Sequence, residues 1–325
     1  MTNFLVRLYQ KEDFEIWNSF VKEAKNGTFL FHRDFMEYHS NRFQDFSLLI
    51  FDANMLISIL PANREGSSVF SHQGLTYGGL LVLQKAKLST TLGVLKSVLL
   101  FLFENKVEKL TLKLIPNFYC DTFSDELEYC LFVANSELIQ IDSLATIDLK
   151  KPFYISKTRR ESIRKGKKNN LIIKEEATFD LFWNKILIPN LNTKHRVKPV
   201  HTLNEITYLK SKFPDHIKQF NVYDNDKIVA GTTVFVTDNV AHPQYISGNS
   251  NKNELGSLDY LYHYLITDVF ADKSFFDFGI SNENGGKNVN QGLLFWKESF
   301  GAKTIVQRFY SVETINYKLL NNVLI

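Results

Sequence analysis

Cysteine is scarce in this chain: among 325 residues, only Cys120 and Cys130 occur. Two cysteines do not make the disulfide framework of a small secreted domain, and the N-terminus does not resemble a secretory signal. Long apolar runs are also missing, because the longest, Leu92–Phe103, is interrupted by Lys96 and is too short to span a bilayer. We therefore expect a reduced, soluble, cytoplasmic protein without stable membrane insertion.

The chain also lacks a strong charge of either sign. Its formal net charge is +3, which suits an anionic small ligand better than a nucleic acid, for which a stronger basic stripe is expected. No HExxH, paired CxxC or carboxylate-cluster pattern occurs, so we expect no metal. The tripeptides His32-Arg33-Asp34 and Asp277-Phe278-Gly279 match two kinase motifs, but no Gly-rich loop precedes them. Phosphoryl transfer is therefore not expected.

Material for a hydrophobic core is plentiful, with 44% hydrophobic residues and 28 phenylalanines, and the length is comfortable for two domains. Periodic patterns predict helices at 30–39, 89–105 and 203–212 and strands at 69–77, 217–223 and 227–237. The composition changes at a basic helix, 155–170, so we expect domains at 1–150 and 151–325. In both halves, helices come first in the sequence, and a β-meander and then a helix crossover follow. This order predicts an α/β (α+β) fold in which each domain has a mixed, mainly antiparallel sheet flanked by helices.

The segment from Lys227 to Phe300 carries the most specific pattern. Two β runs lead to a polar turn that contains Gly248 and Gly256. A long amphipathic helix, a strand at 274–279 and a second helix follow. This order resembles the second half of an acyl-CoA N-acyltransferase domain of the GNAT superfamily. The resemblance implies acyl transfer from coenzyme A to an amine.

Two further segments are similar to the FemAB-like nonribosomal peptidyltransferases. They are KTRRESIRKGKKNNLIIKEE at 157–176 and the pair DFGISNENG and GLLFWKESFGA at 277–302. That group has two tandem GNAT-like domains with an acceptor groove between them, and it acylates nucleotide-linked or lipid-linked sugar peptides from aminoacyl-tRNA. The chain departs from the group in two ways. We find no paired heptads for a helical arm, and Leu80-Leu81 follows Gly78-Gly79 where the family has an acidic residue after Gly-Pro.

The stretches NGTFLFHRDFMEYH and SHQGLTYGGL, at 26–39 and 71–80, resemble a sub-branch found among surface-polysaccharide gene products. N-acyltransferases that act on nucleotide-linked amino sugars, such as a dTDP-3-amino-3,6-dideoxyhexose, belong to that branch. The resemblance implies an acyl-CoA donor, a nucleotide-linked amino-sugar acceptor and a role in O-antigen or capsule precursor synthesis. It places the acceptor in the first domain and CoA in the second. An aminoacyl-tRNA-dependent peptidyltransferase and a non-catalytic nucleotide-sugar binding module remain as alternatives, and a homodimer is one possibility.

Attack of an amine on a thioester needs close placement, a donor for the developing oxyanion and a proton acceptor, but no nucleophile on the enzyme. The candidates for the proton acceptor are Asp277, His72 and Tyr245. Asp277 lies near the end of the strand at 274–279, where ligands meet open sheets. An equally good alternative is that it only hydrogen-bonds backbone. Transfer through water or the substrate itself also stays open.

Binding residues are predicted from the same pattern. In a GNAT domain the CoA arm lies on an exposed strand, here 242–248, and its pyrophosphate meets a helix N-terminus, here after Gly256. The CoA candidates are Ser247, Gly248, Asn249, Gly256, Ser257 and Leu258. The acceptor candidates are His32, Arg33, Gln73, Tyr77, Lys157, Arg159, Arg160, Arg164, Ser281 and Asn284, with Lys287 and Asn290 on the same loop as the last. The alternatives are an ordinary capped helix, a solvated charge run and core histidines.

Overall fold

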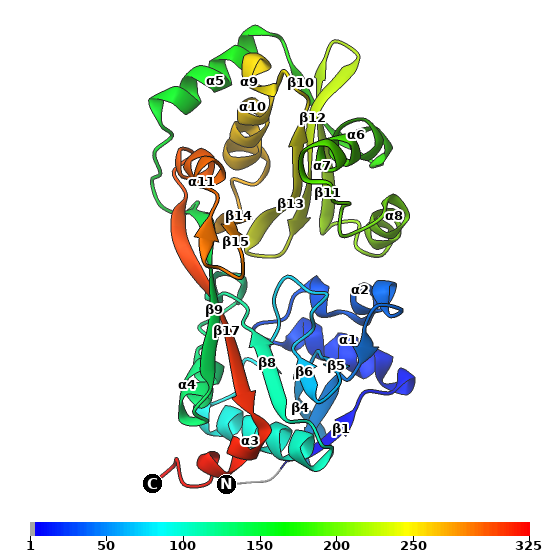
Figure 1. The fold of residues 1–325 in the computed structure, drawn as a ribbon, viewed down its shortest axis with the longest axis vertical. Helices are drawn as coiled ribbons and strands as arrows, with labels where there is room; N and C mark the ends of the chain where they lie inside the picture. The colour runs from blue at the N-terminus through cyan, green and yellow to red at the C-terminus, as the bar shows by residue number, and fades with distance from the viewer. Residues whose placement is uncertain (1–3) are drawn as a thin grey trace. The chain divides into compact units, whose positions relative to one another are not determined.

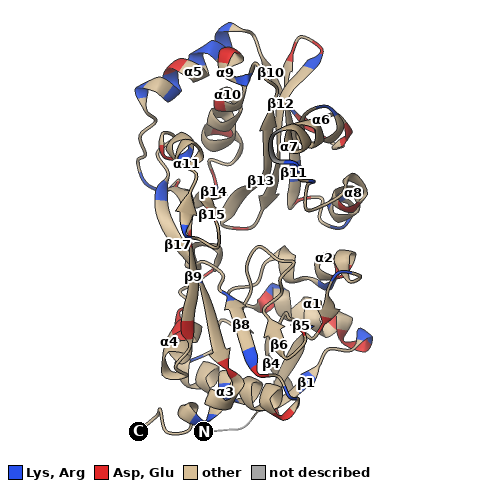
Figure 2. Ribbon diagram, viewed as in Figure 1, with Lys and Arg blue, Asp and Glu red and all other residues tan. Residues whose placement is uncertain are grey.

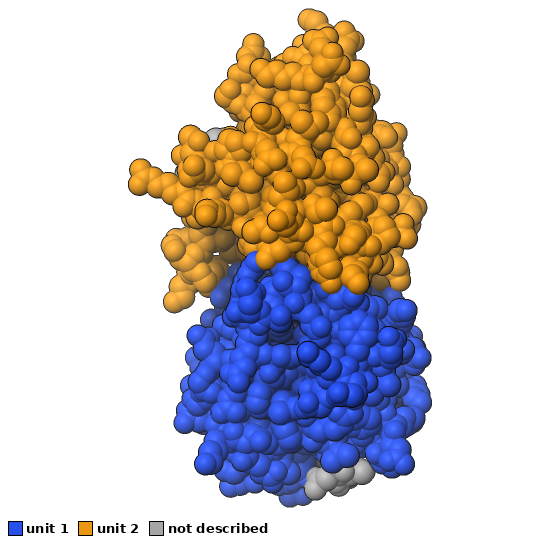
Figure 3. Space-filling view, turned by 90° about the vertical axis from the view of Figure 1, so that its right-hand side faces the viewer, with its two compact units in different colours: residues 1–142, 306–325 blue, residues 143–305 orange. Residues whose placement is uncertain are grey.

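The computed structural model describes residues 4–325, which form two compact units (Figure 3). The first unit comprises the chain up to residue 142 together with residues 306–325, and the second comprises residues 143–305. Each unit has its own buried apolar core. Among the described residues, no helix combines the length and the apolar character that a membrane crossing would need.

The first unit contains a four-stranded antiparallel sheet in the order β1-β3-β4-β7, and a second group of strands in which β6 runs parallel to β8 (Figure 1). Its strands are β1 (Leu5–Leu8), β2 (Gln44–Asp45), β3 (Leu48–Asp52), β4 (Met55–Leu60), β5 (Asn63–Glu65), β6 (Ser68–Phe70), β7 (Leu81–Val82) and β8 (Lys109–Lys113). Its helices are α1 (Phe14–Glu23), α2 (Arg33–Met36), α3 (Leu88–Glu104) and α4 (Glu126–Val133). The apolar run at 92–103 lies within α3, where Leu95 and Leu99 are fully buried, so the predicted core helix is confirmed.

The C-terminal segment from residue 306 onward belongs to this first unit. Strand β17 (Lys303–Glu313) pairs antiparallel with β8, with Phe309 opposite Lys113 and Glu313 opposite Lys109. The 3₁₀ helix η7 (Thr314–Leu320) then packs against α3 and buries Leu320 in the core. The observed units therefore differ from the predicted division at residue 150. A strand pattern does not state which distant strand it will pair with, and here the partner lies in the other half of the sequence.

Two predicted elements of the first unit are shorter than expected. The predicted strand at 69–77 ends after Phe70, because His72 adopts a φ of +64° that breaks the extended backbone. The predicted helix at 30–39 consists of separate short turns, which are a 3₁₀ turn at Phe29–Phe31, α2, and a 3₁₀ turn at Glu37–His39. The aromatic side chains that supported the helical pattern are nevertheless buried, as for Phe31 and Phe35.

The second unit contains neighbouring strands in the order β10-β11-β12-β13-β14-β9, of which β9 begins in the first unit and continues into the second. The strands are β9 (Glu137–Asp148), β10 (Ile172–Glu176), β11 (Ile217–Asp224), β12 (Lys227–Val236), β13 (Val240–Gly248), β14 (Phe275–Ile280), β15 (Asn282–Glu283) and β16 (Asn288–Val289). The α-helices are α5 (Lys157–Lys168), α6 (Asp180–Phe182), α7 (Ile188–His195), α8 (Leu203–Lys212), α9 (Lys252–Leu255), α10 (Ser257–Tyr264) and α11 (Gln291–Glu298). The chain order from β12 to α11 matches the predicted order of strands and helices.

Helices cover both faces of this sheet (Figure 1). Helices α5, α9 and α10 lie on one face, and α6, α7 and α8 lie on the other. Strands β10, β11, β12 and β13 pair antiparallel with one another in that order, whereas β14 runs parallel to β13 and antiparallel to β9. The predicted mixed, mainly antiparallel sheet flanked by helices is therefore confirmed.

Local signals explain where several of these elements begin. The Ser156 side chain accepts a hydrogen bond from the backbone of Arg159 and starts α5. Thr202 and Glu205 form a reciprocal capping box at the start of α8, whose bounds agree with the predicted helix 203–212. Asn290 caps α11 by accepting from the N–H of Leu293 at 3.0 Å. Each of these signals lies within four residues of the helix that it starts.

Candidate functional site

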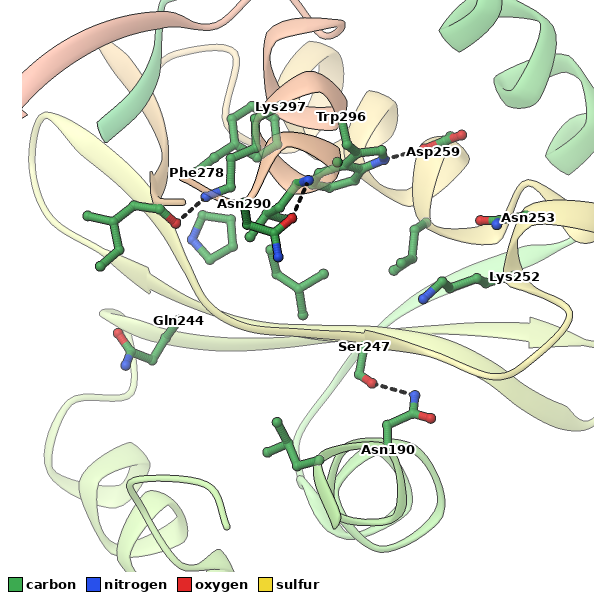
Figure 4. Close-up of a pocket in the computed structure, with 17 residues that line it drawn as sticks. Asn190, Gln244, Ser247, Lys252, Asn253, Asp259, Phe278, Asn290, Trp296 and Lys297 are labelled. Atoms are coloured by element: carbon green, nitrogen blue, oxygen red, sulfur yellow. Dashed lines mark hydrogen bonds between the residues drawn. The ribbon is translucent and has the colours of Figure 1, made fainter. Parts of the chain in front are cut away.

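The candidate site lies where strands β13 and β14 separate. The parallel pairing between them is limited to Val240 with Phe275 and Ala241 with Phe276. A pocket of about 670 Å³ opens beyond that point (Figure 4). Its lining comes from both strands and from the helices beside them: Asn190, Leu191, Pro243, Gln244, Ile246, Ser247, Lys252, Asn253, Leu258, Asp259, Phe278, Ile280, Asn290, Gly292, Leu293, Trp296 and Lys297. Asn190 on α7 and Trp296 on α11 come from opposite faces of the sheet, so the pocket reaches through the gap.

A β-bulge in β13 faces this gap. The register shifts between Thr233 and Val234, whose partners are Tyr245 and Pro243, so Gln244 has no partner in the β12–β13 ladder. Pro243 has no N–H to donate, which favours an irregularity at this position. The Gln244 side-chain carbonyl oxygen is also buried without a hydrogen-bond partner among the described residues. The bulge therefore offers polar groups that a ligand can bind.

A buried lysine lies on the opposite wall of the pocket. Lys297, on α11, donates hydrogen bonds from Nζ to the carbonyl oxygens of Gly279 at 3.0 Å and Ile280 at 2.5 Å. Burial lowers its pKa to about 8, partly offset by the charge of Asp277. The ammonium is held at the end of β14 and lines the pocket, where it can stabilise a negative charge on a ligand.

The wall formed by α10 and α11 is held by a hydrogen-bonded set of side chains. Trp296 donates from Nε1 to Asp259 at 2.7 Å, and Arg159 pairs with the second oxygen of that carboxylate at 2.5 Å. Arg159 also donates to the hydroxyl of Ser299 at 3.1 Å and lies over the ring of Phe300. These contacts orient Trp296 beside the pocket. They also give the predicted substrate residue Arg159 partners inside the unit.

Asp277 does not line the pocket. The residue is 1% exposed, and its carboxylate accepts hydrogen bonds from the Thr146 hydroxyl at 3.2 Å and the Gly279 N–H at 2.8 Å. The Nδ1 atom of His242 lies 3.0 Å from the backbone oxygen of Asp277 and 3.3 Å from its carboxylate. The predicted proton acceptor is therefore separated from solvent by its own hydrogen-bond partners.

The predicted CoA residues divide into two groups. Ser247 and Leu258 line the pocket, whereas Gly248, Asn249, Gly256 and Ser257 do not. The Gly256 N–H donates to the Lys252 carbonyl at 2.9 Å, so this predicted phosphate donor is not free. Ser257 is fully buried, and a Cβ at Gly256 would lie 2.2 Å from the Ser162 carbonyl oxygen of α5. Gly256 therefore serves the close packing of α10 on α5.

Other predicted residues of the second unit are dispersed. The Tyr245 ring is buried against that of Trp183, and its hydroxyl lies 2.5 Å from His201 Nδ1. Ser281 is buried at the end of β14, and its hydroxyl has no hydrogen-bond partner in the part of the chain that is described. Asn284 is exposed in the turn between β15 and β16. The basic residues Lys157, Arg160 and Arg164 of α5 are exposed. Several segments of the α5 ribbon carry Lys or Arg (Figure 2).

The predicted residues of the first unit have internal partners. Arg33 is buried and pairs with Glu37 and Asp45 beneath the ring of Tyr9. The Tyr77 hydroxyl donates to Thr28 at 3.2 Å. These contacts give Arg33 and Tyr77 a structural role in the packed interior of the first unit.

His72, Gln73 and His32 lie in the same unit. His72 is 5% exposed, and burial lowers its pKa to about 3, so the ring is neutral at pH 7. Gln73 is exposed and bonds to Asn63 at 2.7 Å, and His32 is half-buried. Catalytic or acceptor roles for these three residues remain predictions.

Sequence reasoning missed Gln244, Trp296 and Lys297. The available signals were a Pro-Gln pair inside a β pattern and a lysine that directly follows the run Leu293–Trp296. Neither signal indicates a site until the separation of β13 and β14 is known, because a lysine at the end of an apolar run usually reaches solvent.

Comparisons with known proteins extend the fold assignment. Scans against protein-family models and curated proteins gave no match. Among solved structures, FemX is similar with a TM-score of 0.66 and 10% identity, over 98% of this chain and 99% of that one. L-PGS from Bacillus licheniformis is similar with a TM-score of 0.61 and 11% identity, over 96% of this chain and 94% of that one. A protein of unknown function from Bacteroides thetaiotaomicron is similar with a TM-score of 0.54 and 10% identity, over 95% of this chain and 99% of that one. The chain therefore has a FemX-like fold, as the resemblance to FemAB-like proteins predicted.

Proposed function

We propose that this chain is an N-acyltransferase that moves an acyl group, of the acetyl or 3-hydroxybutyryl type, from acyl-CoA to the amine of a nucleotide-linked amino sugar. The observation that carries the proposal is the gap between β13 and β14. Among residues 4–325, no strand pairs with the edge of β13 beyond Ala241 on the side of β14. An extended ligand with amide groups, such as the pantetheine arm of CoA, can bind a free strand edge through backbone hydrogen bonds.

The pocket lining supports direct attack of the amine on the thioester. It contains no cysteine, so a covalent thioester on the enzyme has no candidate there. The backbone at the Gln244 bulge and the ammonium of Lys297 are groups of the pocket that can stabilise the developing oxyanion. Leu258, Leu293 and Trp296 supply an apolar wall that limits access of water to the thioester.

The acceptor is proposed from the resemblance of the N-terminal stretches, which points to a dTDP-linked amino-deoxy sugar for surface polysaccharides made in the cytoplasm. The exposed basic face of α5 supports an anionic acceptor. Arg160 keeps its guanidinium at the surface, where it bonds to the Tyr154 hydroxyl at 3.1 Å, and Arg164 lies one turn further along the helix. Guanidinium groups of this kind suit a nucleotide diphosphate.

A second candidate is an aminoacyl-tRNA-dependent transferase of the FemAB type. The observation in its favour is the likeness to FemX over nearly the whole of both chains. Both candidates place an activated acyl group in the same gap. They differ in the donor, because only the first requires free CoA to bind.

The test is thermal denaturation with CoA, dTDP and UDP added separately and together. A ligand at about 100 times its Kd stabilises the folded state by roughly 2.7 kcal/mol. We expect CoA to raise the midpoint of the wild type and of Leu181→Trp, which alters an exposed residue of α6. Leu258→Trp, which fills the pocket, should abolish that rise. A response to UDP alone would favour the FemAB-type transferase, and no response to any ligand would favour a non-catalytic module.

A further inference from the structure

The imidazole of His242 lies at the point where the two strands part. His242 follows the last paired residue of β13, Ala241, and precedes the pocket-lining residues Pro243 and Gln244. On β14, its neighbour Gly279 lies between the pocket-lining residues Phe278 and Ile280. The ring therefore lies between the two strands, next to residues that line the pocket, although His242 is not itself among the lining residues.

Gly279 provides the space for this ring. A Cβ at that position would lie 2.9 Å from the Cε1 atom of His242, and the backbone φ of +70° also favours glycine. The glycine of the Asp277-Phe278-Gly279 tripeptide thus allows the imidazole to approach β14. The same approach brings Nδ1 to Asp277.

The hydrogen bonds determine which nitrogen carries the proton. Nδ1 of His242 lies 3.0 Å from the backbone oxygen of Asp277 and 3.3 Å from its carboxylate, and both are acceptors. In the neutral imidazole Nδ1 is therefore the donor, and Nε2 carries the lone pair. The Asp277 carboxylate is itself oriented by the Thr146 hydroxyl and the Gly279 N–H. The His242 side chain keeps 15% of its surface exposed, whereas that of Asp277 keeps 2%.

We propose that His242 is the general base of the acyl transfer and that Asp277 is a positioning residue that acts through it. This inference rests on the proposed function. The neutral amine attacks the thioester carbonyl carbon, the N–C bond forms and the C–S bond breaks. The amine proton moves to Nε2 of His242, and the resulting imidazolium returns it to the departing thiolate, which leaves as free CoA. A buried carboxylate behind the ring stabilises the imidazolium that forms in between.

The charged groups around the ring are arranged for this role. Asp277 faces it from β14, and the neighbouring residue of β9, Thr146, is uncharged. The ammonium of Lys297 is directed to the carbonyl oxygens of Gly279 and Ile280 and has no hydrogen bond to the imidazole. Phe235, the partner of His242 on β12, carries no charge. Asp277 is thus the carboxylate in direct contact with the ring.

The first arm of the test does not depend on turnover. Long-range ¹H–¹⁵N spectra of the wild type at neutral pH should show the His242 proton on Nδ1, and Asp277→Asn should change this signal. A proton on Nε2 would overturn the proposal whatever the substrate of the enzyme is. Calorimetry with CoA on the same samples tests the proposed function separately, because CoA binding does not require a base.

The second arm measures thiol release from acetyl-CoA with a dTDP-3-amino-3,6-dideoxyhexose as the acceptor. We expect His242→Gln to lower kcat at least about 100-fold, as for the loss of a general base, with the KM for acetyl-CoA changed less than about 3-fold. Imidazole in the buffer should restore part of the activity of His242→Ala. The control is His263→Gln, which alters a half-buried histidine of α10 whose Nδ1 lies 3.4 Å from the Thr267 hydroxyl, and it should keep wild-type rates. Unchanged kcat in His242→Gln, or a loss that imidazole does not restore and that accompanies loss of CoA binding, would make His242 a structural tie between the strands.

Discussion

Replacing Lys297 by methionine should remove a pH dependence of stability that the wild type shows above neutral pH. The residue is 2% exposed, and burial lowers its pKa from 10.5 to about 8. The folded state therefore releases this proton near pH 8, whereas the unfolded chain holds it up to about pH 10.5. Between these values the unfolded state binds more protons, so the free energy of unfolding rises with pH. The stabilisation is absent below pH 8 and complete above pH 10.5.

The magnitude follows from the difference between the two pKa values. At about 1.4 kcal/mol for each pH unit, the full effect is roughly 3 kcal/mol. Between pH 7 and pH 9.5 the expected gain is about 2 kcal/mol, because the unfolded lysine is still mostly protonated at pH 9.5. Methionine has a similar length and no charge, so the variant should lack this gain.

The assay is urea denaturation at pH 7, 8.5 and 9.5, followed by tryptophan fluorescence. Trp296 and Trp183 both lie in the second unit and report on its unfolding. At each pH, the free energy of unfolding of Lys297→Met is subtracted from that of the wild type. The change of this difference with pH is the quantity compared, because contributions from other titrating groups cancel in it. Lys287→Met, which removes an exposed lysine from the β15–β16 turn, controls for the loss of a positive charge. If the free energies of unfolding of wild type and Lys297→Met changed with pH in parallel, the lowered pKa of the buried Lys297 would be refuted.

Three further predictions concern packing and charge. Gly256→Ala should lower the free energy of unfolding by at least about 2 kcal/mol, because its Cβ would meet a carbonyl oxygen of α5 and the backbone φ is +70°. The control is Gly66→Ala, at φ +60° in open space, which should cost only about 1 kcal/mol in the same urea titrations. Arg159→Met leaves a buried carboxylate unpaired and should cost about 3–5 kcal/mol, while Arg160→Met on the exposed face should stay within about 0.5 kcal/mol by the same measurement. Burial lowers the pKa of His72 from 6.5 to about 3, so on acidification the unfolded state takes up the proton first. The free energy of unfolding should therefore fall by about 2 kcal/mol between pH 7 and pH 5. In His72→Asn, a substitution that tolerates the positive φ, this decrease should be much smaller, and an equal decrease in the variant would contradict the assignment.

Local structure was predictable wherever the signals lie close together in the chain. The helix at 203–212 has its capping box and apolar stripe within ten residues, and its predicted bounds agree with α8. The strands of the β11–β12 hairpin alternate around a turn in which Asn225 adopts a positive φ, so this hairpin was also predictable. The order of elements from 227 to 300 was enough to predict the fold class.

The candidate site was only partly predictable. Ser247 and Leu258 were predicted and line the pocket, because the strand and the helix that carry them were assigned correctly. The environment of Asp277 was not predictable, since its partners Thr146 and His242 come from two other strands. Arg159 and Arg160 are adjacent in sequence, yet the first is bound to Asp259 and the second is exposed.

The sequence by itself determined helices with local caps such as α8, the β11–β12 hairpin, the fold class and the absence of a membrane-length apolar run, since these depend on periodicity and on signals within a few residues. Tertiary structure alone decided that β17 joins β8, that β13 and β14 separate after two paired residues, and that Lys297 is buried beside the resulting gap. These features arise from contacts between residues far apart in the chain. Such contacts depend on which surfaces remain available after the local elements have formed, and no short pattern encodes that choice.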